Sequence, residues 1–162
     1  MKTSHLLLAS CLAVVACHPG PQADSQSPAV LAESAEYRAE GFVALSLPEL
    51  SDAVATGETT SLALTQAYLD RIDAVDRNGP RLQSVLSLNP DALDQAMASD
   101  ARRAAGEARG PLDGLPILLK DNIESLDPLA TTAGSYALHE NITGRDSPLV
   151  AGLRAQGAVI LG

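Results

Sequence analysis

Two short apolar runs, at 116–120 and 158–161, lie near the end of this 162-residue chain. The first reads Pro-Ile-Leu-Leu-Lys and the second reads Ala-Val-Ile-Leu. Short runs that are apolar on every side are typical of strands buried in a sheet whose faces are covered. Between them a helical pattern opens at Ser147 and Pro148 and ends at Gly157. The order strand, helix, strand predicts an α/β fold in which helices cover a sheet.

The residues before the first run predict further helices and one strand. Pro48 suits a first helical turn and Gly57 an end, which predicts a helix at 47–57. Helical spacing of apolar residues predicts a second helix at 60–76. Alternation of Leu and polar residues predicts a short strand at 82–88.

A helix is also predicted from Asn89, as its cap, to Gly106. Its expected polar face carries Arg102 and Arg103, which we expect to be solvated. Its expected apolar face consists of Leu93, Ala96, Met97, Ala101 and Ala104.

The first 16 residues are predicted to be an export signal. A short polar start containing Lys2 precedes an uncharged apolar run that is shorter than the ~20 residues of a membrane-spanning helix. The run ends in Val-Val-Ala-Cys, which resembles a bacterial lipobox and predicts lipidation of Cys17. The alternative is an ordinary secretory signal cut near Ala16.

Residues 17–45 are predicted to be a lipoprotein tether or linker, since their Pro-, Gln-, Ser- and Ala-rich beginning cannot bury a core. We therefore expect an exported protein, either periplasmic or anchored to a membrane of a bacterial envelope. The two cysteines are Cys11 and Cys17, so no disulfide or cysteine metal site is expected in the chain after them. The net charge of −9 makes nucleic acid an unfavourable partner.

The apolar run at 116–120 ends in Lys120, the candidate for chemistry. A lysine ammonium is costly to bury, and a lysine that loses its charge by desolvation can act as a general base. The alternative is a lysine that reaches solvent at the end of a strand. The pattern alone favours that solvated interpretation.

The stretch 114–123 is similar to the Gly-Val-Pro-Ile-Ala-Val-Lys-Asp-Asn motif of the amidase signature family. The resemblance covers about residues 46–162 and continues in separate blocks, in the family's order, at 65–72, 131–135, 146–150 and 153–162. Within the family the chain looks most like bacterial peptide amidases, on the segments 79–82, 88–93 and 117–123.

The resemblance implies the family's α/β/α fold with a mixed central sheet, of which residues 46–162 would be an incomplete N-terminal part. It implies hydrolysis of carboxamide C–N bonds, with C-terminal peptide amides as one substrate class, and no metal or organic cofactor. The family uses a Ser–cis-Ser–Lys triad in which Lys120 matches the catalytic lysine. The bridging and nucleophilic serines are expected beyond Gly162, so these 162 residues alone should be inactive. Ser135 matches neither serine and is expected to have a structural role.

Three other hypotheses stay open. The chain could belong to an amidase with another substrate. An amidotransferase subunit that modifies charged tRNA is disfavoured by the export signal. A non-catalytic remnant or an envelope-anchored binding lipoprotein is the alternative outside enzymes.

The remaining candidates are expected to have no catalytic role. Asp121 and Asn122 are predicted to organise the strand exit through side-chain hydrogen bonds rather than to exchange protons. His139 is a lone histidine in a polar loop, without partners for a metal. The Asn-Ile-Thr sequence at 141–143 fits an N-glycosylation pattern, which carries little meaning in a bacterial-type lipoprotein.

Overall fold

A computed structural model describes residues 37–162. The predicted signal segment 1–16, the lipidation site Cys17 and residues 17–36 of the predicted linker lie outside the described residues. The described elements are η1 (Gly41–Ala44), α2 (Leu47–Thr56), α3 (Ser61–Arg71), the π-helical η2 (Ile72–Asn78), α4 (Ala92–Ala104), β1 (Pro116–Ile117), η3 (Tyr136–Leu138), α5 (Pro148–Ala155) and β2 (Val159–Ile160). None of the helices in this part of the chain is long and apolar enough to cross a membrane.

The two predicted strands form a parallel pair, which confirms the α/β expectation. Pro116 lies opposite Val159, and Ile117 lies opposite Ile160. Backbone hydrogen bonds continue the pairing at both ends: Gly114 N–H donates to Gly157 at 2.9 Å, and Leu119 N–H donates to Gly162 at 2.9 Å. The paired segments therefore run nearly as far as the apolar runs in the sequence.

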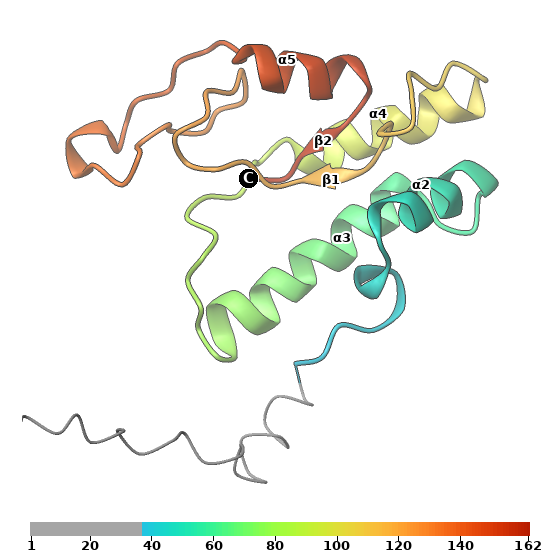
Figure 1. Cartoon of the computed structure of the whole chain (residues 1–162), viewed down its shortest axis with the longest axis horizontal. Coiled ribbons are helices and arrows are strands. Elements are labelled where there is room, and N and C mark those ends of the chain that lie inside the picture. The colour runs from blue at the N-terminus through green and yellow to red at the C-terminus, as the bar shows by residue number, and fades with distance from the viewer. Residues whose placement is uncertain (1–36) are drawn as a thin grey trace, which may run out of the picture. The chain divides into compact units, whose positions relative to one another are not determined.

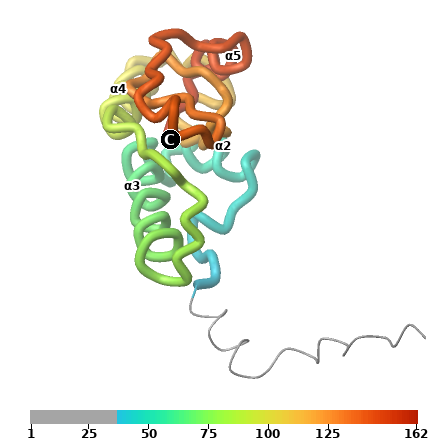
Figure 2. The backbone as a smooth tube through the Cα atoms, turned by 90° about the vertical axis from the view of Figure 1, so that its left-hand side faces the viewer, coloured from blue at the N-terminus to red at the C-terminus, as the bar shows by residue number. Residues whose placement is uncertain are grey.

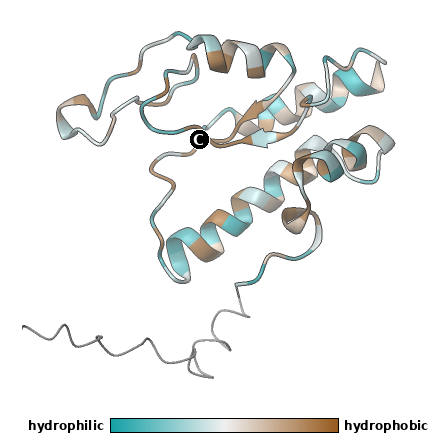
Figure 3. Cartoon of the chain, viewed as in Figure 1, coloured by the Kyte–Doolittle hydropathy of each residue, from teal (hydrophilic) through white to brown (hydrophobic). Residues whose placement is uncertain are grey.

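Helices cover the strand pair on two sides. Figures 1 and 2 show α5 on one side and α2 and α3 on the other. One cluster of buried side chains joins α4 and β2 and consists of Ile72, Ala92, Ala96, Val159 and Leu161. A second cluster joins α2, α3 and the start of β1 and consists of Leu50, Val54, Leu64 and Leu115. The strand pair is accordingly among the hydrophobic parts of the chain in Figure 3.

Polar side chains cap the first turns of two helices. Thr60 accepts a hydrogen bond from Ala63 N–H at 3.1 Å at the start of α3, and Ser147 accepts one from Val150 N–H at 3.3 Å at the start of α5. Gly57 ends α2 in the left-handed conformation, with a φ of 77°. The second predicted helix continues past Arg71, but as a π-helical segment to Asn78.

The strand predicted at 82–88 is wrong. Arg81 and Gln83 have φ values of 57° and 51°, which interrupt an extended backbone. The carboxylate of Asp76 accepts hydrogen bonds from the N–H groups of Ser84 and Val85, so these groups bond to a side chain instead of a strand. The segment therefore forms a loop, and its Leu82 and Leu86 side chains are 63% and 66% exposed.

Asn89 and Gln95 cover the outer edge of β2. Asn89 Nδ2 donates to Ile160 O at 2.7 Å, and Asn89 N–H donates to Leu161 O at 2.9 Å. Ile160 N–H donates to Gln95 Oε1 at 3.0 Å. Asn89 therefore bonds to β2 and does not cap the helix as predicted, and α4 begins only at Ala92.

The predicted apolar face of this helix is displaced. Ala92, Ala96 and Ser99 are its buried residues, while Met97 is 47% exposed and Ala101 is exposed. The reason is that Gln95, Ser99 and Arg102 lie on the inward side of α4. Their side chains donate hydrogen bonds to the buried carboxylates of Asp127 and Asp113.

A glycine substitution tests the close contact between Gly157 and Asp113, just before the two strands pair. Gly157 has a φ of 86°, and an added Cβ would lie 2.3 Å from Asp113 Oδ1. Gly106 has a φ of 74°, but an added Cβ would meet nothing within 4 Å. An alanine in the left-handed conformation lowers the free energy of unfolding by about 1–2 kcal/mol at either position. At Gly157 the added Cβ must also displace Asp113, which lowers it by about 1–3 kcal/mol more. Urea unfolding should therefore show Gly157→Ala to be clearly less stable than Gly106→Ala; equal stabilities would refute this account of the contact.

Candidate active site

A cavity of about 300 Å³ opens at the carboxyl ends of the two parallel strands. Gly162, close after β2, lines it together with Leu118, Leu119 and Lys120 after β1. Two loops complete the wall: the segment 84–87 and the segment 123–131. Ligands in open α/β sheets bind at this edge, because the loops that follow parallel strands converge there. The position of the cavity thus makes it the candidate functional site.

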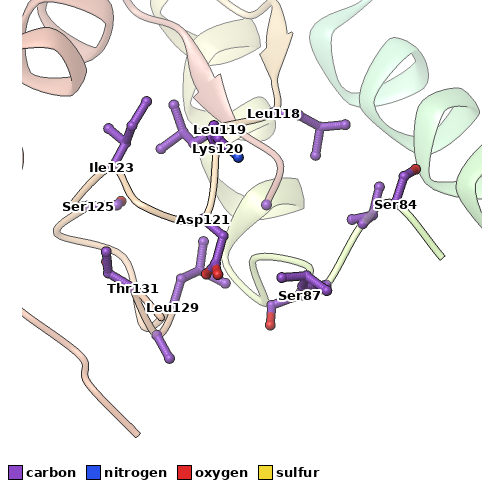
Figure 4. Close-up of a pocket in the computed structure, with 14 residues that line it drawn as sticks. Ser84, Ser87, Leu118, Leu119, Lys120, Asp121, Ile123, Ser125, Leu129 and Thr131 are labelled. Atoms are coloured by element: carbon purple, nitrogen blue, oxygen red, sulfur yellow. The ribbon is translucent and has the colours of Figure 1, made fainter. Parts of the chain in front are cut away.

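Lys120 is one of the residues that line this cavity. Figure 4 shows Lys120 beside Leu119, with Asp121 next to it. The last bond of the strand pair, from Leu119 N–H to Gly162 O, comes immediately before it. Ile123 N–H then donates to Lys120 O at 2.9 Å, which turns the chain away from the sheet. Lys120 is exposed within residues 37–162, so its assignment as a catalytic base stays a prediction.

Asp121 fastens the turn after Lys120 to the loop opposite. Its carboxylate accepts hydrogen bonds from Thr132 N–H at 3.1 Å, Gly134 N–H at 3.0 Å and the Thr132 hydroxyl. The hydroxyl bond is the main cause that lowers the pKa of Asp121; desolvation opposes it, and the two backbone bonds and the charge of Lys120 add to it. The predicted structural role of Asp121 is confirmed. The other residue of this prediction, Asn122, is exposed.

Two serine hydroxyls at the cavity already bond to carboxylates. Ser84 Oγ donates to Asp76 Oδ1 at 2.5 Å, and Ser125 Oγ donates to Asp127. Within residues 37–162, no hydrogen bond joins Lys120 to a serine. Ser135 lies in a loop, where its N–H donates to Thr132 O at 2.9 Å.

A charged cluster next to Ser125, which lines the cavity, was not predicted from the sequence. Arg154 on α5 donates to Asp127 Oδ2 at 2.7 Å and to Asp146 Oδ2 at 2.8 Å. Asp127 also accepts from Gln95 Nε2 at 2.6 Å and from Asn89 Nδ2 at 3.1 Å. The cluster therefore joins α4, α5 and the loop that holds Ser125. Its members are separated by up to 65 positions, and no local spacing signals the contact.

The electrostatics of this cluster favour charged carboxylates. Burial by itself raises the pKa of Asp127, but the hydrogen bonds from Arg154 and Ser125 outweigh burial and the pKa is lowered. The pKa of Asp146 is lowered mainly by its hydrogen bond from Arg154. The same pairs raise the pKa of Arg154.

The prediction that Arg102 and Arg103 are merely solvated is wrong. Asp113, only 1% exposed, accepts a hydrogen bond from Arg102 at 2.5 Å, and Arg103 donates to Asp113 O at 2.8 Å. Ser99 Oγ donates to the same carboxylate at 2.9 Å. A buried carboxylate just before β1 requires partners, and α4 supplies them.

The remaining candidates lie apart from the cavity lining. His139 is exposed and stacks on Tyr136, with ring centroids 4.8 Å apart. Asn141 Nδ2 donates to Thr131 O at 3.0 Å, so it supports the loop that lines the cavity. The described part of the chain holds no group of three or more His, Cys, Asp or Glu side chains arranged to bind a metal.

The fold and the cavity define an α/β protein with a ligand-binding edge at the carboxyl ends of parallel strands. Residues 63–162 match the Amidase family model. The chain belongs to the amidase family, as the sequence motifs predicted.

Relatives and solved structures agree with this membership. The chain is 42% identical over 116 residues to a putative amidase of Schizosaccharomyces pombe, covering 72% of this chain and 19% of that protein. It is 47% identical to a glutamyl-tRNA(Gln) amidotransferase subunit of Salinispora arenicola, over 75% of this chain and 24% of that one. The crystal structure of native peptide amidase from Stenotrophomonas maltophilia matches with 52% identity and a TM-score of 0.69, over 72% of this chain and 23% of that one. The chain thus spans at most about a quarter of these relatives' length.

Proposed function

We propose that this chain is the lysine-bearing part of an amidase that hydrolyses carboxamide C–N bonds. The observation that carries the proposal is the position of Lys120 in the cavity at the carboxyl ends of β1 and β2. Family membership supports the reaction class, because amidases are hydrolases of this bond. Lys120 is also the only lysine in residues 37–162, so no other ammonium group of this part can take its role.

In the proposed reaction the amine of Lys120 accepts a proton, through a bridging serine, from a nucleophilic serine. The serine oxygen attacks the amide carbon, the C–N bond breaks, and the nitrogen leaves as ammonia after it receives a proton. Water then hydrolyses the acyl-serine ester and regenerates the hydroxyl. Both serines belong, in this proposal, to chain outside residues 1–162.

A base must be uncharged to accept that proton, which requires a dry cavity. Residues 37–162 form only part of its walls, and Lys120 is exposed in them. In the proposal, further chain covers the cavity, removes water from the amine and brings the serines to it.

We propose C-terminal peptide amides as substrates and the bacterial envelope as the location. The 52% identity to a peptide amidase supports the substrate class. The lipobox-like sequence that ends in Cys17 supports export. The 47% identity to an amidotransferase subunit makes glutamine amide transfer the second candidate. A cytoplasmic location would favour that candidate over the envelope enzyme.

The test compares two proteins: residues 1–162 alone, and the complete gene product, meaning the whole translated protein that contains them. We expect ammonia release from a C-terminally amidated peptide by the complete gene product, in an envelope fraction, and none above buffer by residues 1–162. Turnover by residues 1–162 would refute the assignment of the serines. A complete gene product without amide hydrolysis would favour the non-catalytic remnant, and one active only on glutamine in the cytoplasm would favour the amidotransferase.

A further inference from the structure

The geometry points to Asp121 as a positioning residue that fixes Lys120 relative to the cavity wall at 129–134. This inference rests on the proposed function, since it concerns the same cavity. Asp121 follows Lys120 directly and lies beside it in Figure 4. Any change in its backbone is transmitted to the lysine through one peptide bond.

Asp121 accepts hydrogen bonds from three consecutive N–H groups. Its side-chain oxygens accept those of Thr132 and Gly134, and its carbonyl accepts that of Ala133 at 3.1 Å. The Thr132 hydroxyl adds a fourth bond to the carboxylate. Because these donors occupy both side-chain oxygens, the carboxylate holds the loop rather than exchanging protons with a substrate.

The loop that Asp121 holds contains a residue in a strained backbone conformation. Ala133 has a φ of 51°, in the left-handed region that costs a residue with a Cβ about 1–2 kcal/mol. Such conformations persist where the surroundings over-determine them, and they concentrate at functional sites. The four bonds to Asp121 contribute to this constraint, together with bonds within the loop from Gly134 N–H to the Thr132 hydroxyl and from Ser135 N–H to Thr132 O. Without them, we expect the loop to relax to an ordinary φ.

Relaxation of this loop would change the cavity. Leu129, Ala130 and Thr131 line it opposite the segment 84–87, immediately before the bound N–H groups. Asp121 thus sets the distance between the amine of Lys120 and this wall. A base displaced by about 1 Å can cost roughly 100-fold in rate, even when substrate still binds.

Kinetics of the complete gene product test the inference. Asp121→Asn preserves size, but its amide nitrogen cannot accept the bonds from Gly134 and Thr132. We expect kcat to fall about 10- to 100-fold while KM stays within about twofold, the signature of a loss confined to the transition state. Thr132→Val should lower kcat in the same direction, and Thr132→Ser should restore it. The control Asp52→Asn removes the same charge from an exposed position on α2 and should leave both constants unchanged.

Amide hydrogen exchange of the same proteins gives a readout independent of turnover. The N–H groups of Thr132, Ala133 and Gly134 should exchange at least about tenfold faster in Asp121→Asn than in Asp52→Asn. Unchanged exchange, unchanged kcat in an active enzyme, or a rise in KM alone would each overturn the inference. A wild-type protein without amidase activity, but with Asp121-dependent exchange, would instead refute the proposed function.

Discussion

Replacing Lys120 with Ala should lower kcat of the complete gene product on a peptide amide by about 10⁴-fold or more. General-base catalysis contributes roughly 10²–10⁴-fold, and losing one member of a catalytic unit costs up to about 10⁶-fold. Lys120→Arg should be equally inactive, because a guanidinium retains the charge but cannot give up its proton. Steady-state ammonia release measures both variants.

The arginine variant distinguishes a base from a cation. If Lys120 only attracted a negative charge, Lys120→Arg would retain much of the activity that Lys120→Ala loses. The free energy of unfolding should change little in either variant, because Lys120 ends a strand at a cavity and is exposed among the described residues. Near wild-type activity in both variants would show that the assigned role is wrong.

The second large effect concerns stability. Arg154→Ala should lower the free energy of unfolding by about 3–5 kcal/mol, because it leaves the carboxylates of Asp127 and Asp146 buried without their cation. The Asp127 and Asp146 side chains are only 4% and 13% exposed, so little water can reach them to replace the lost partner. Urea unfolding of the complete gene product measures the change.

Arg145→Ala is the matched control. Arg145 also pairs with a carboxylate, that of Glu124, at 2.7 Å, but the arginine side chain is 72% exposed. Exposed pairs contribute little, so this variant should remain close to wild type. Equal losses in the two variants would contradict the claim that burial gives the Arg154 cluster its importance.

Much of the fold was predictable because its elements have local causes. The apolar runs at 116–120 and 158–161 need covered faces, which is the condition for a buried strand. The capping residues Thr60 and Ser147 act within one helical turn of their own position. Gly57 and Gly157 take left-handed conformations that few other residues adopt.

The errors arose where side chains from distant positions decided the structure. The segment 82–88 alternates like a strand, but Asp76 binds its N–H groups and positive φ values interrupt it. The inner face of α4 was assigned from its apolar residues alone. In the structure Ser99 and Arg102 lie on that face and donate hydrogen bonds to the carboxylate of Asp113. The spacing of apolar residues cannot predict this contact.

The candidate site was predicted in part. A lysine that ends a buried apolar run must lie at the carboxyl end of a strand, and Lys120 does. Its expected catalytic role rests on the family motif and not on the hydrophobic pattern. The bonds from Thr132 and Gly134 to Asp121, which shape the wall beside Lys120, cross more than ten positions and required the structure.

A crystal structure of the complete gene product tests the central claim most directly, through the surroundings of the Lys120 amine. We predict that Nζ lies within hydrogen-bond distance, about 2.7–3.2 Å, of a serine hydroxyl in a cavity closed to bulk water. An amine that projects into solvent, with no serine hydroxyl near it, would contradict the account.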